Sequence, residues 1–167
     1  MYTLPDYEPP DKIGKLTDDE VDAFLAQPWK TRLATITYEN TPYIVPLWYQ
    51  FDVAERVFYI VARGRSKYVQ HILHNPAVAL QIADDGHLEN TRVMIEGTAK
   101  ILVGPVPPDE HPELQEIVLD MSRRYMGEEG PAYAKHTISQ PRYLIRITPD
   151  RWTTWTGRAW APRYRKD

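Results

Sequence analysis

A run of alternating apolar and polar residues, TRVMIEGTAKILV at positions 91–103, is the strongest constraint on how this chain can fold. Every second residue from Val93 to Val103 is apolar or a glycine, and a β-strand places every second side chain on one face. The run therefore predicts a long strand with one buried face. Gly97 stands in the middle of that face, where it predicts a bend or the close approach of another backbone.

The rest of the chain has the pattern of shorter strands and helices. A capping box, Thr17 followed by Glu20, begins the first helix, and Pro28 ends it. Further strands are predicted at 33–38, 43–51, 56–62, 77–83 and 141–157, with further helices at 66–74 and 113–126. Because hairpins join most of the strands, we expect a mainly β (α+β) fold, a six-stranded antiparallel barrel with peripheral helices.

Composition excludes several functional classes. The 167 residues include no cysteine, which excludes disulfides, thiolate nucleophiles, cysteine-ligated zinc and iron–sulfur clusters. A net charge of -3 gives no overall reason to expect nucleic acid or an anionic membrane as a partner. No basic start precedes an apolar run, and no segment approaches the ~20 apolar residues of a membrane span. We therefore expect a cytoplasmic protein.

A single domain is expected to account for most of the chain. Three prolines among acidic and polar residues, Pro5, Pro9 and Pro10, predict an extended N-terminal arm over residues 1–14. No internal repeat or long linker divides the chain after this arm. We expect one domain at 15–158 and a C-terminal tail at 159–167.

A basic turn, ARGRSK at 62–67, lies between a predicted strand and a predicted helix. Free backbone N–H groups and the positive end of the dipole favour an anion at a helix start. The spacing does not match a P-loop, which needs the order GxxxxGK[ST]. Local chemistry leaves two interpretations open, a phosphate-binding turn and an ordinary solvated turn.

The histidines suggest no metal site or catalytic triad. His71 and His74 stand three residues apart on a predicted helix, but no third ligand follows at a recognisable spacing. We interpret both as ordinary helix-surface residues. The other histidines show no HExxH or triad pattern, so no metal ligand and no catalytic side chain is assigned.

The aromatic residues gather in two parts of the chain. Trp48, Tyr49, Phe51, Phe58 and Tyr59 belong to adjacent predicted strands, and further tryptophans lie near the C-terminus. Each alone is typical of a packed core. Together with the basic turn, they are also compatible with the wall of a planar, phosphorylated ligand.

Four segments in order give the chain its resemblance to a known family. They are RLATITYENTPYIVPLWYQFD, FYIVARGRSKYVQHILHNPAVAL, RVMIEGTAKIL and ITPDRWTTWTGR, within residues 17–158. The series resembles the flavin-binding split-barrel superfamily that includes pyridoxamine 5'-phosphate oxidase. The resemblance implies a homodimer of split β-barrels with FMN at the dimer interface. It also implies hydride transfer between flavin N5 and a small-molecule substrate, chemistry that belongs mainly to the cofactor.

Site residues carried over from the resemblance fall into three groups. Two strand segments would contact the flavin ring, and these are Val45, Pro46, Leu47 and Trp48, then Tyr59, Ile60 and Val61. The basic turn would bind the phosphate through Arg65, Ser66 and Lys67. Near the ring the resemblance places Arg92, Trp155 and Arg165.

Departures from the oxidase itself imply a relative with another substrate. The stretch WAPRYRKD stands where the oxidase has an Arg-Leu-His-Asp segment for its pyridoxal substrate. Val45 replaces an arginine that opens the flavin strand, and Arg92 stands where the oxidase usually has a glutamine. Some relatives use F420 and a few bind haem, so two alternatives remain, an F420-dependent reductase and a non-catalytic flavin- or haem-binding protein.

Overall fold

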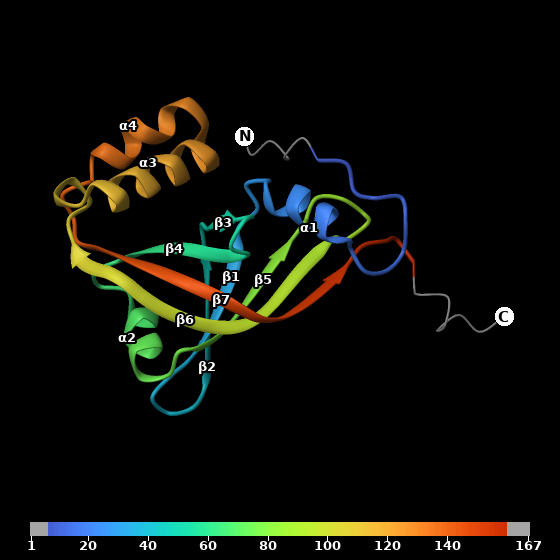
Figure 1. Cartoon of the computed structure of the whole chain (residues 1–167), viewed down its shortest axis with the longest axis horizontal. Helices are drawn as coiled ribbons and strands as arrows, with labels where there is room; N and C mark the ends of the chain where they lie inside the picture. Colours follow the sequence, from blue (N-terminus) through green and yellow to red (C-terminus); the bar gives the residue numbers. More distant parts are fainter. Residues whose placement is uncertain (1–6, 160–167) are drawn as a thin grey trace.

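The computed structural model describes residues 7–159 as one antiparallel sheet with helices around it (Figure 1). The sheet has seven strands in the order β2-β1-β5-β6-β7-β4-β3. Their bounds are β1 Thr31–Ile36, β2 Pro42–Leu47, β3 Gln50–Asp52, β4 Val57–Arg63, β5 Ala77–Ala83, β6 Arg92–Val106 and β7 Arg142–Trp155. The mainly β, antiparallel class predicted from the sequence is confirmed. Within residues 7–159 no strand pairing joins β2 to β3, so the ladder has two free edges.

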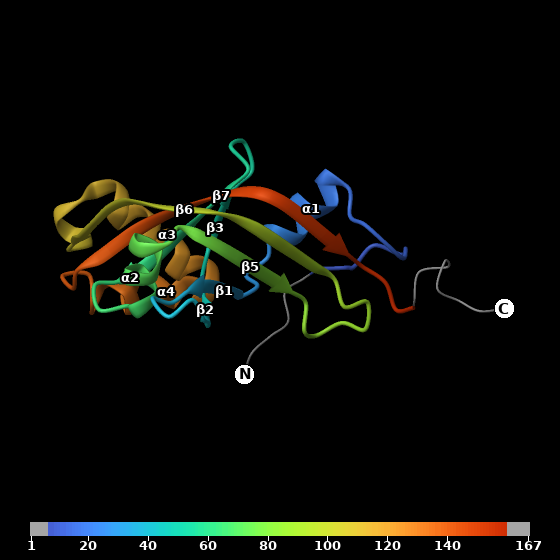
Figure 2. The ribbon, with the colours of Figure 1, turned by 90° about the horizontal axis from the view of Figure 1, so that it is seen from below.

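The two longest strands, β6 and β7, form a ribbon that runs the length of the molecule (Figures 1 and 2). The first half of β6 pairs with β5, which leads on to β1 and β2. The first half of β7 pairs with β4, which leads on to β3. Because β6 and β7 are antiparallel, these two wings of the sheet attach at opposite ends of the ribbon.

The alternation predicted for residues 91–103 is confirmed in the first part of β6. Val93, Ile95 and Ala99 are buried, and the side chains between them are exposed. The pairing with β7 shifts register between Glu96 and Gly97. A Cβ on Gly97 would lie 2.4 Å from the carbonyl oxygen of Thr148, so the close backbone approach predicted for this glycine is also confirmed.

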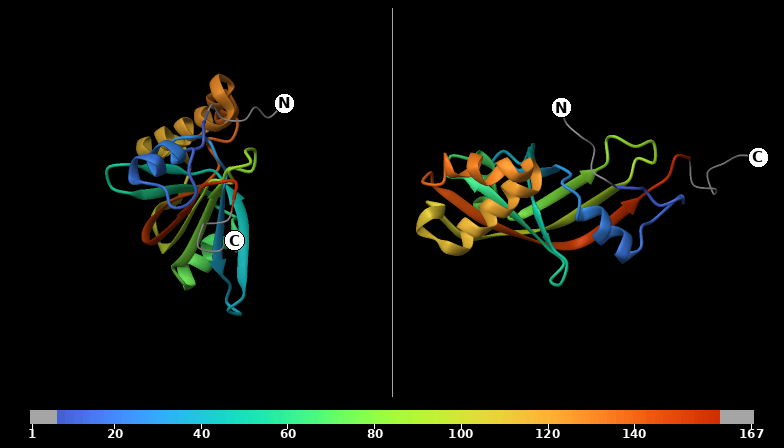
Figure 3. Two further views of the ribbon diagram at one scale, coloured as in Figure 1. Left: turned by 90° about the vertical axis from the view of Figure 1, so that its right-hand side faces the viewer. Right: turned by 90° about the horizontal axis from the view of Figure 1, so that it is seen from above.

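Four α-helices pack around the sheet: α1 Asp18–Leu25, α2 Lys67–His74, α3 Pro112–Met126 and α4 Gly130–Lys135. The Thr17–Glu20 capping box is present at α1, whose Phe24 and Leu25 are fully buried. Ser66 is the N-cap of α2, although its side chain makes no capping hydrogen bond. Figure 3 shows α3 and α4 together at one end of the molecule and α1 towards the other.

Helix α4 is not among the helices predicted from the sequence. It packs against α3 at Gly130, where a Cβ would lie 2.0 Å from the carbonyl oxygen of Ser122. The absence of a side chain at that position therefore permits the two helices to meet.

The prediction of six strands is wrong because the strand expected at 43–51 is broken at Trp48 and Tyr49. The backbone N–H of Tyr49 donates to the Tyr125 hydroxyl (3.1 Å), and that hydroxyl lies 3.2 Å from the Tyr49 carbonyl. The same hydroxyl donates to the Trp29 carbonyl (2.9 Å). A side chain of α3 thus takes the place of a neighbouring strand, and the chain crosses from one sheet edge, β2, to the other, β3.

Gly97→Ala tests the approach of β6 to β7. We expect the free energy of unfolding to fall by about 1–3 kcal/mol, because the added methyl group must displace the backbone at Thr148. Urea unfolding followed by circular dichroism measures the change. Lys100→Ala, at an exposed position of the same strand, should change the stability by less than about 0.5 kcal/mol. Equal stabilities of the two variants would contradict the prediction.

Tyr125→Phe tests the contact at the strand break. The free energy of unfolding should fall by about 1–3 kcal/mol, because the Tyr49 N–H loses its partner inside the protein. Tyr133→Phe on α4 is the matched control, since Tyr133 is 52% exposed. Thermal and urea unfolding of the two variants give the comparison, and a loss in the control as large as that in Tyr125→Phe would contradict the assigned role.

Candidate functional site

The basic turn lies at the start of α2 and is held to the first residues of β7. The Gly64 N–H donates to the Pro141 carbonyl (2.8 Å), and the Ser66 N–H donates to the Arg63 carbonyl (2.9 Å). Arg63, Arg65 and Lys67 are exposed, and none of them belongs to an ion pair within residues 7–159. Their positive charges are therefore uncompensated beside the N-terminus of a helix.

Arg142 adds a fourth cation that the sequence did not indicate. It is the register partner of Arg63 in the pairing of β4 with β7. Its guanidinium donates to the Thr137 hydroxyl (2.9 Å), and no carboxylate in the described part of the chain pairs with it. Burial, and secondarily the charge of Arg63, lower the pKa of Arg142 below its usual value. We call Arg63, Arg65, Lys67 and Arg142 the cationic cluster.

The first predicted ring-contacting segment lies on and just after the edge strand β2. Val45 and Leu47 are half-buried and Pro46 is exposed. Trp48 lies beyond the strand, where its ring stacks on Tyr125 with a centroid distance of 4.9 Å and an interplanar angle of 1°. One face of the Trp48 indole is therefore occupied by α3.

The second predicted segment, in β4, shows different exposure from residue to residue. Ile60 is fully buried in the core, whereas Tyr59 and Val61 are half-buried. Tyr59 pairs across the sheet with Gln50 and Arg146. Of the three predicted residues in this strand, only Tyr59 and Val61 have side chains with accessible surface.

Arg92 and Trp155, which are far apart in sequence, are brought together. They are register partners in the pairing of β6 with β7, and the Arg92 guanidinium carbon lies 5.9 Å from the centre of the Trp155 ring. This is within the range of a cation–π contact. The remaining predicted residue, Arg165, lies outside the described residues.

The cationic cluster and the Arg92–Trp155 pair stand at opposite ends of β7. Arg142 begins that strand and Trp155 ends it. Its 14 residues, at about 3.3 Å each, separate the two groups by roughly 40 Å along the strand. A mononucleotide bound at the cluster of one chain is too short to reach Trp155 of the same chain.

The outer face of the larger wing carries a shallow apolar groove of about 340 Å³. Five adjacent strands contribute to it, and Ile44 and Met94 are exposed there at 66% and 36%. We call it the sheet-face groove, and its lining residues are Arg32, Ala34, Ile44, Ala79, Leu80, Gln81, Met94, Ile95, Glu96 and Thr153.

A second hollow, of about 380 Å³, lies where β2 and β5 end and β1 begins. Arg32 lines both spaces, so the two adjoin. We call this one the Trp29 hollow, and it is lined by Trp29, Lys30, Arg32, Pro46, Ala83, Asp85 and Gly86.

The interpretation of His71 as a helix-surface residue is wrong, although His74 is exposed as expected. His71 is buried, with its Nδ1 3.0 Å from the Thr35 hydroxyl and its ring 5.2 Å from that of Tyr43.

No group of three metal-ligating side chains occurs in residues 7–159. No helix in that range is long and apolar enough to cross a membrane.

Several solved structures have the same fold. A conserved hypothetical protein from Mycobacterium tuberculosis superposes with a TM-score of 0.69 at 20% identity, covering 90% of each chain. An F420 reductase gives 0.60 at 24% identity, covering 79% of this chain and 94% of that one. The heme storage protein HutZ from Vibrio cholerae gives 0.63 at 14% identity, covering 82% and 93%. At these identities the likeness establishes the fold alone.

The family is established by a match along the sequence. No curated protein matches the chain. The family model described as pyridoxamine 5'-phosphate oxidase matches residues 17–156, which include the basic turn, both predicted ring-contacting segments and the Arg92–Trp155 pair. The chain therefore belongs to the pyridoxamine 5'-phosphate oxidase family.

Proposed function

We propose that this protein is an FMN-dependent oxidoreductase that works as a homodimer of split barrels, with FMN bound at the interface and a small molecule as substrate. The observation that carries the proposal is the cationic cluster. Arg63, Arg65 and Lys67 lie before and at the start of α2, Arg142 pairs in register with Arg63, and no carboxylate in residues 7–159 forms an ion pair with any of them. A phosphate monoester is the type of anion that such a cluster accommodates.

The residues of the cluster fit a phosphate in charge and in burial. Arg142 is partly buried with its pKa lowered, so an anion nearby would relieve the cost of holding it charged. Lys67 and Arg65 supply exposed charge, and the first N–H groups of α2 supply donors. When bound, FMN supplies hydride transfer at N5, and the chain binds it, orients it and excludes water.

Assembly into a dimer would complete the site. Within one chain the cationic cluster and the Arg92–Trp155 pair are too far apart along β7 for one mononucleotide. In the proposed dimer the second copy covers the sheet-face groove, and its Arg92 and Trp155 would complete the site at the first copy's cluster. The exposed apolar side chains of that groove, Ile44 and Met94, favour such a contact.

Two alternatives follow from solved structures of the same fold. One of these is an F420 reductase, and another is a heme storage protein. The alternatives are an F420-dependent reductase and a non-catalytic flavin or haem carrier. Mass spectrometry of the extracted cofactor distinguishes FMN, F420 and haem. Reoxidation of the reduced flavin by small-molecule acceptors, beyond the slow reaction with oxygen, distinguishes the enzyme from the carrier.

Lys67→Glu tests the cationic cluster with two ligands. The dissociation constant for FMN should rise by about 10- to 100-fold, because a charge-assisted contact to phosphate contributes about 1.5–3 kcal/mol. Riboflavin lacks the phosphate, so its weaker binding should change little. Quenching of flavin fluorescence measures both.

The matched control is Arg123→Glu, a charge reversal at an exposed position of α3 that belongs to none of the predicted site segments. It should leave FMN binding unchanged. If Lys67→Glu does not alter FMN binding, or weakens riboflavin binding equally, the phosphate assignment fails.

Ile44→Asp tests the dimer. The wild-type protein should sediment as a dimer, and a carboxylate in the sheet-face groove should convert it to a monomer and abolish FMN binding with it. Val53→Asp is the control, since Val53 is 53% exposed on the other wing of the sheet, in the turn between β3 and β4. A monomeric wild-type protein, or an Ile44→Asp variant that remains dimeric, would refute the proposed interface.

A further inference from the structure

The Trp29 hollow has the size and the walls of a site for a small flat molecule. Its volume of about 380 Å³ falls within the range of ligand pockets. The Trp29 indole and Pro46 provide apolar wall, and Ala83 and Gly86 leave room between them. None of the roles assigned to the cationic cluster uses this space.

Charges at the hollow favour an acid with a single negative charge. Arg32 and Lys30 are two cations in its lining, and Asp85 is one carboxylate, which leaves one positive charge in excess. Lys30 belongs to none of the ion pairs found among residues 7–159. A monocarboxylate would balance this single excess positive charge, whereas a doubly charged phosphate would leave the hollow with a net negative charge.

The contact between Arg32 and Asp85 indicates how a carboxylate would bind. The Arg32 guanidinium donates to the Asp85 carboxylate and to Gln81 Oε1 (3.3 Å), so a carboxylate already occupies one of its donor positions. The Asp85 side chain is 68% exposed, and ion pairs at so exposed a position contribute little. The carboxylate of a bound molecule can therefore replace that of Asp85 on the guanidinium.

Trp29 has a polar group without a partner in the described part of the chain. The residue is 3% exposed, and its ring stacks on Phe24 at 5.5 Å with an interplanar angle of 25°. The indole Nε1 is buried and has no hydrogen-bond acceptor within residues 7–159. Buried donors of this kind are rare in proteins, so the N–H signal of Trp29 is a sensitive reporter of changes at the hollow.

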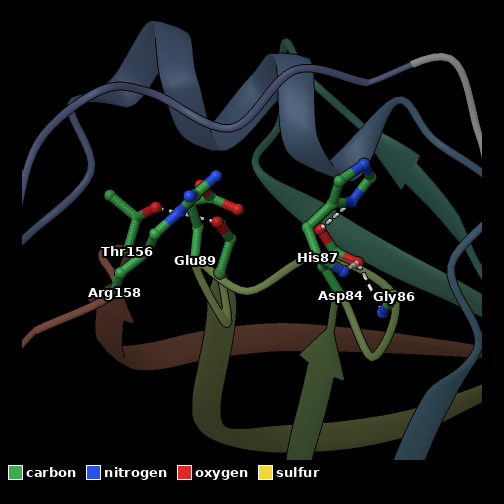
Figure 4. A network of polar contacts seen from close by, with 7 residues as sticks. Asp84, Gly86, His87, Glu89, Thr156 and Arg158 are labelled. Atoms are coloured by element: carbon green, nitrogen blue, oxygen red, sulfur yellow. Dashed lines mark hydrogen bonds and ion pairs between the residues drawn. The ribbon is translucent and has the colours of Figure 1, made fainter.

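The part of the lining formed by Asp85 and Gly86 belongs to a loop that a network of hydrogen bonds holds in place (Figure 4). The buried Asp84 carboxylate accepts from the Gly86 N–H (2.9 Å) and the His87 N–H (3.1 Å), and lies 2.6 Å from His87 Nδ1. Glu89, farther along the same loop, pairs with Arg158. The backbone that carries Asp85 and Gly86 is thus held in place, whereas the Asp85 side chain is held by its exposed ion pair with Arg32.

We propose that the Trp29 hollow binds a small planar monocarboxylic acid, with its carboxylate on Arg32 and Lys30 and its flat body against Trp29 and Pro46. Binding itself needs no flavin. Because Pro46 is also one of the residues predicted to lie at the flavin ring, such acids are the substrate class we assign to the enzyme, and that second step rests on the proposed function.

Benzoate is the probe, with benzamide as its uncharged isostere. Equilibrium dialysis of labelled benzoate against the cofactor-free protein should show saturable binding, and benzamide should not compete.

Three variants test the residues of the hollow, and a fourth is their control. Asp85→Asn removes the carboxylate that competes with benzoate for the Arg32 guanidinium, so it should tighten benzoate binding by three- to tenfold. Arg32→Gln and Lys30→Gln should each weaken it, the former by tenfold or more. Asp120→Asn, an exposed aspartate paired with Arg123 on α3, is the matched control and should have no effect.

Two further measurements keep the result specific to the hollow. Indole N–H signals in a ¹H–¹⁵N spectrum should include one that shifts with benzoate and is missing in Trp29→Phe. The association state of Arg32→Gln is measured in parallel, because Arg32 also lines the sheet-face groove.

Absence of saturable benzoate binding, equal competition by benzamide, or unchanged affinity in both Asp85→Asn and Arg32→Gln would overturn the proposal. The cofactor-free experiment is independent of flavin binding, so its failure is distinguishable from a failure of FMN to bind.

Discussion

The pairing of β6 with β7 is the interaction on which the rest of the structure depends. The ribbon fixes the two wings of the sheet at opposite ends, and the residues of the candidate site lie on these wings and on the ribbon. The cationic cluster lies where β7 begins and the Arg92–Trp155 pair where it ends. The approach of the two backbones depends on Gly97, because any side chain there would meet Thr148. A local requirement for glycine thus lies within the ribbon that separates two parts of the candidate site.

Helix α3 holds two segments of the chain in place, the one after α1 and the one after β2. The Tyr125 hydroxyl contacts backbone groups of Trp29 and Tyr49, and Arg124 of the same helix donates to the carbonyls of Leu25 and Gln27 (both 2.6 Å). These contacts hold the segment after α1 and the break after β2 against one helix. Trp29 belongs to the first of these segments and Pro46 lies two residues before the break, and both line the Trp29 hollow. The shape of the hollow therefore depends on a helix that does not line it.

The features that the sequence predicted correctly have their causes close together in the chain. The alternation in β6, the capping box of α1 and the strand at 77–83 each follow from neighbouring residues. The missed features depend on distant partners. The break at Tyr49 requires Tyr125, the burial of His71 requires Thr35, and the place of Arg142 beside Arg63 requires the pairing of β4 with β7. The basic turn was visible in the sequence, but its fourth cation was not.

Arg32 lines both the sheet-face groove and the Trp29 hollow. Within the proposed homodimer, one guanidinium would therefore face the partner on one side and the acid on the other. Ligand occupancy and self-association would then be thermodynamically linked, and such linkage is reciprocal. If the acid changes the affinity between subunits by a given factor, dimerisation changes the affinity for the acid by the same factor. In this way a single arginine would make the oligomeric state of the protein depend on the concentration of its substrate.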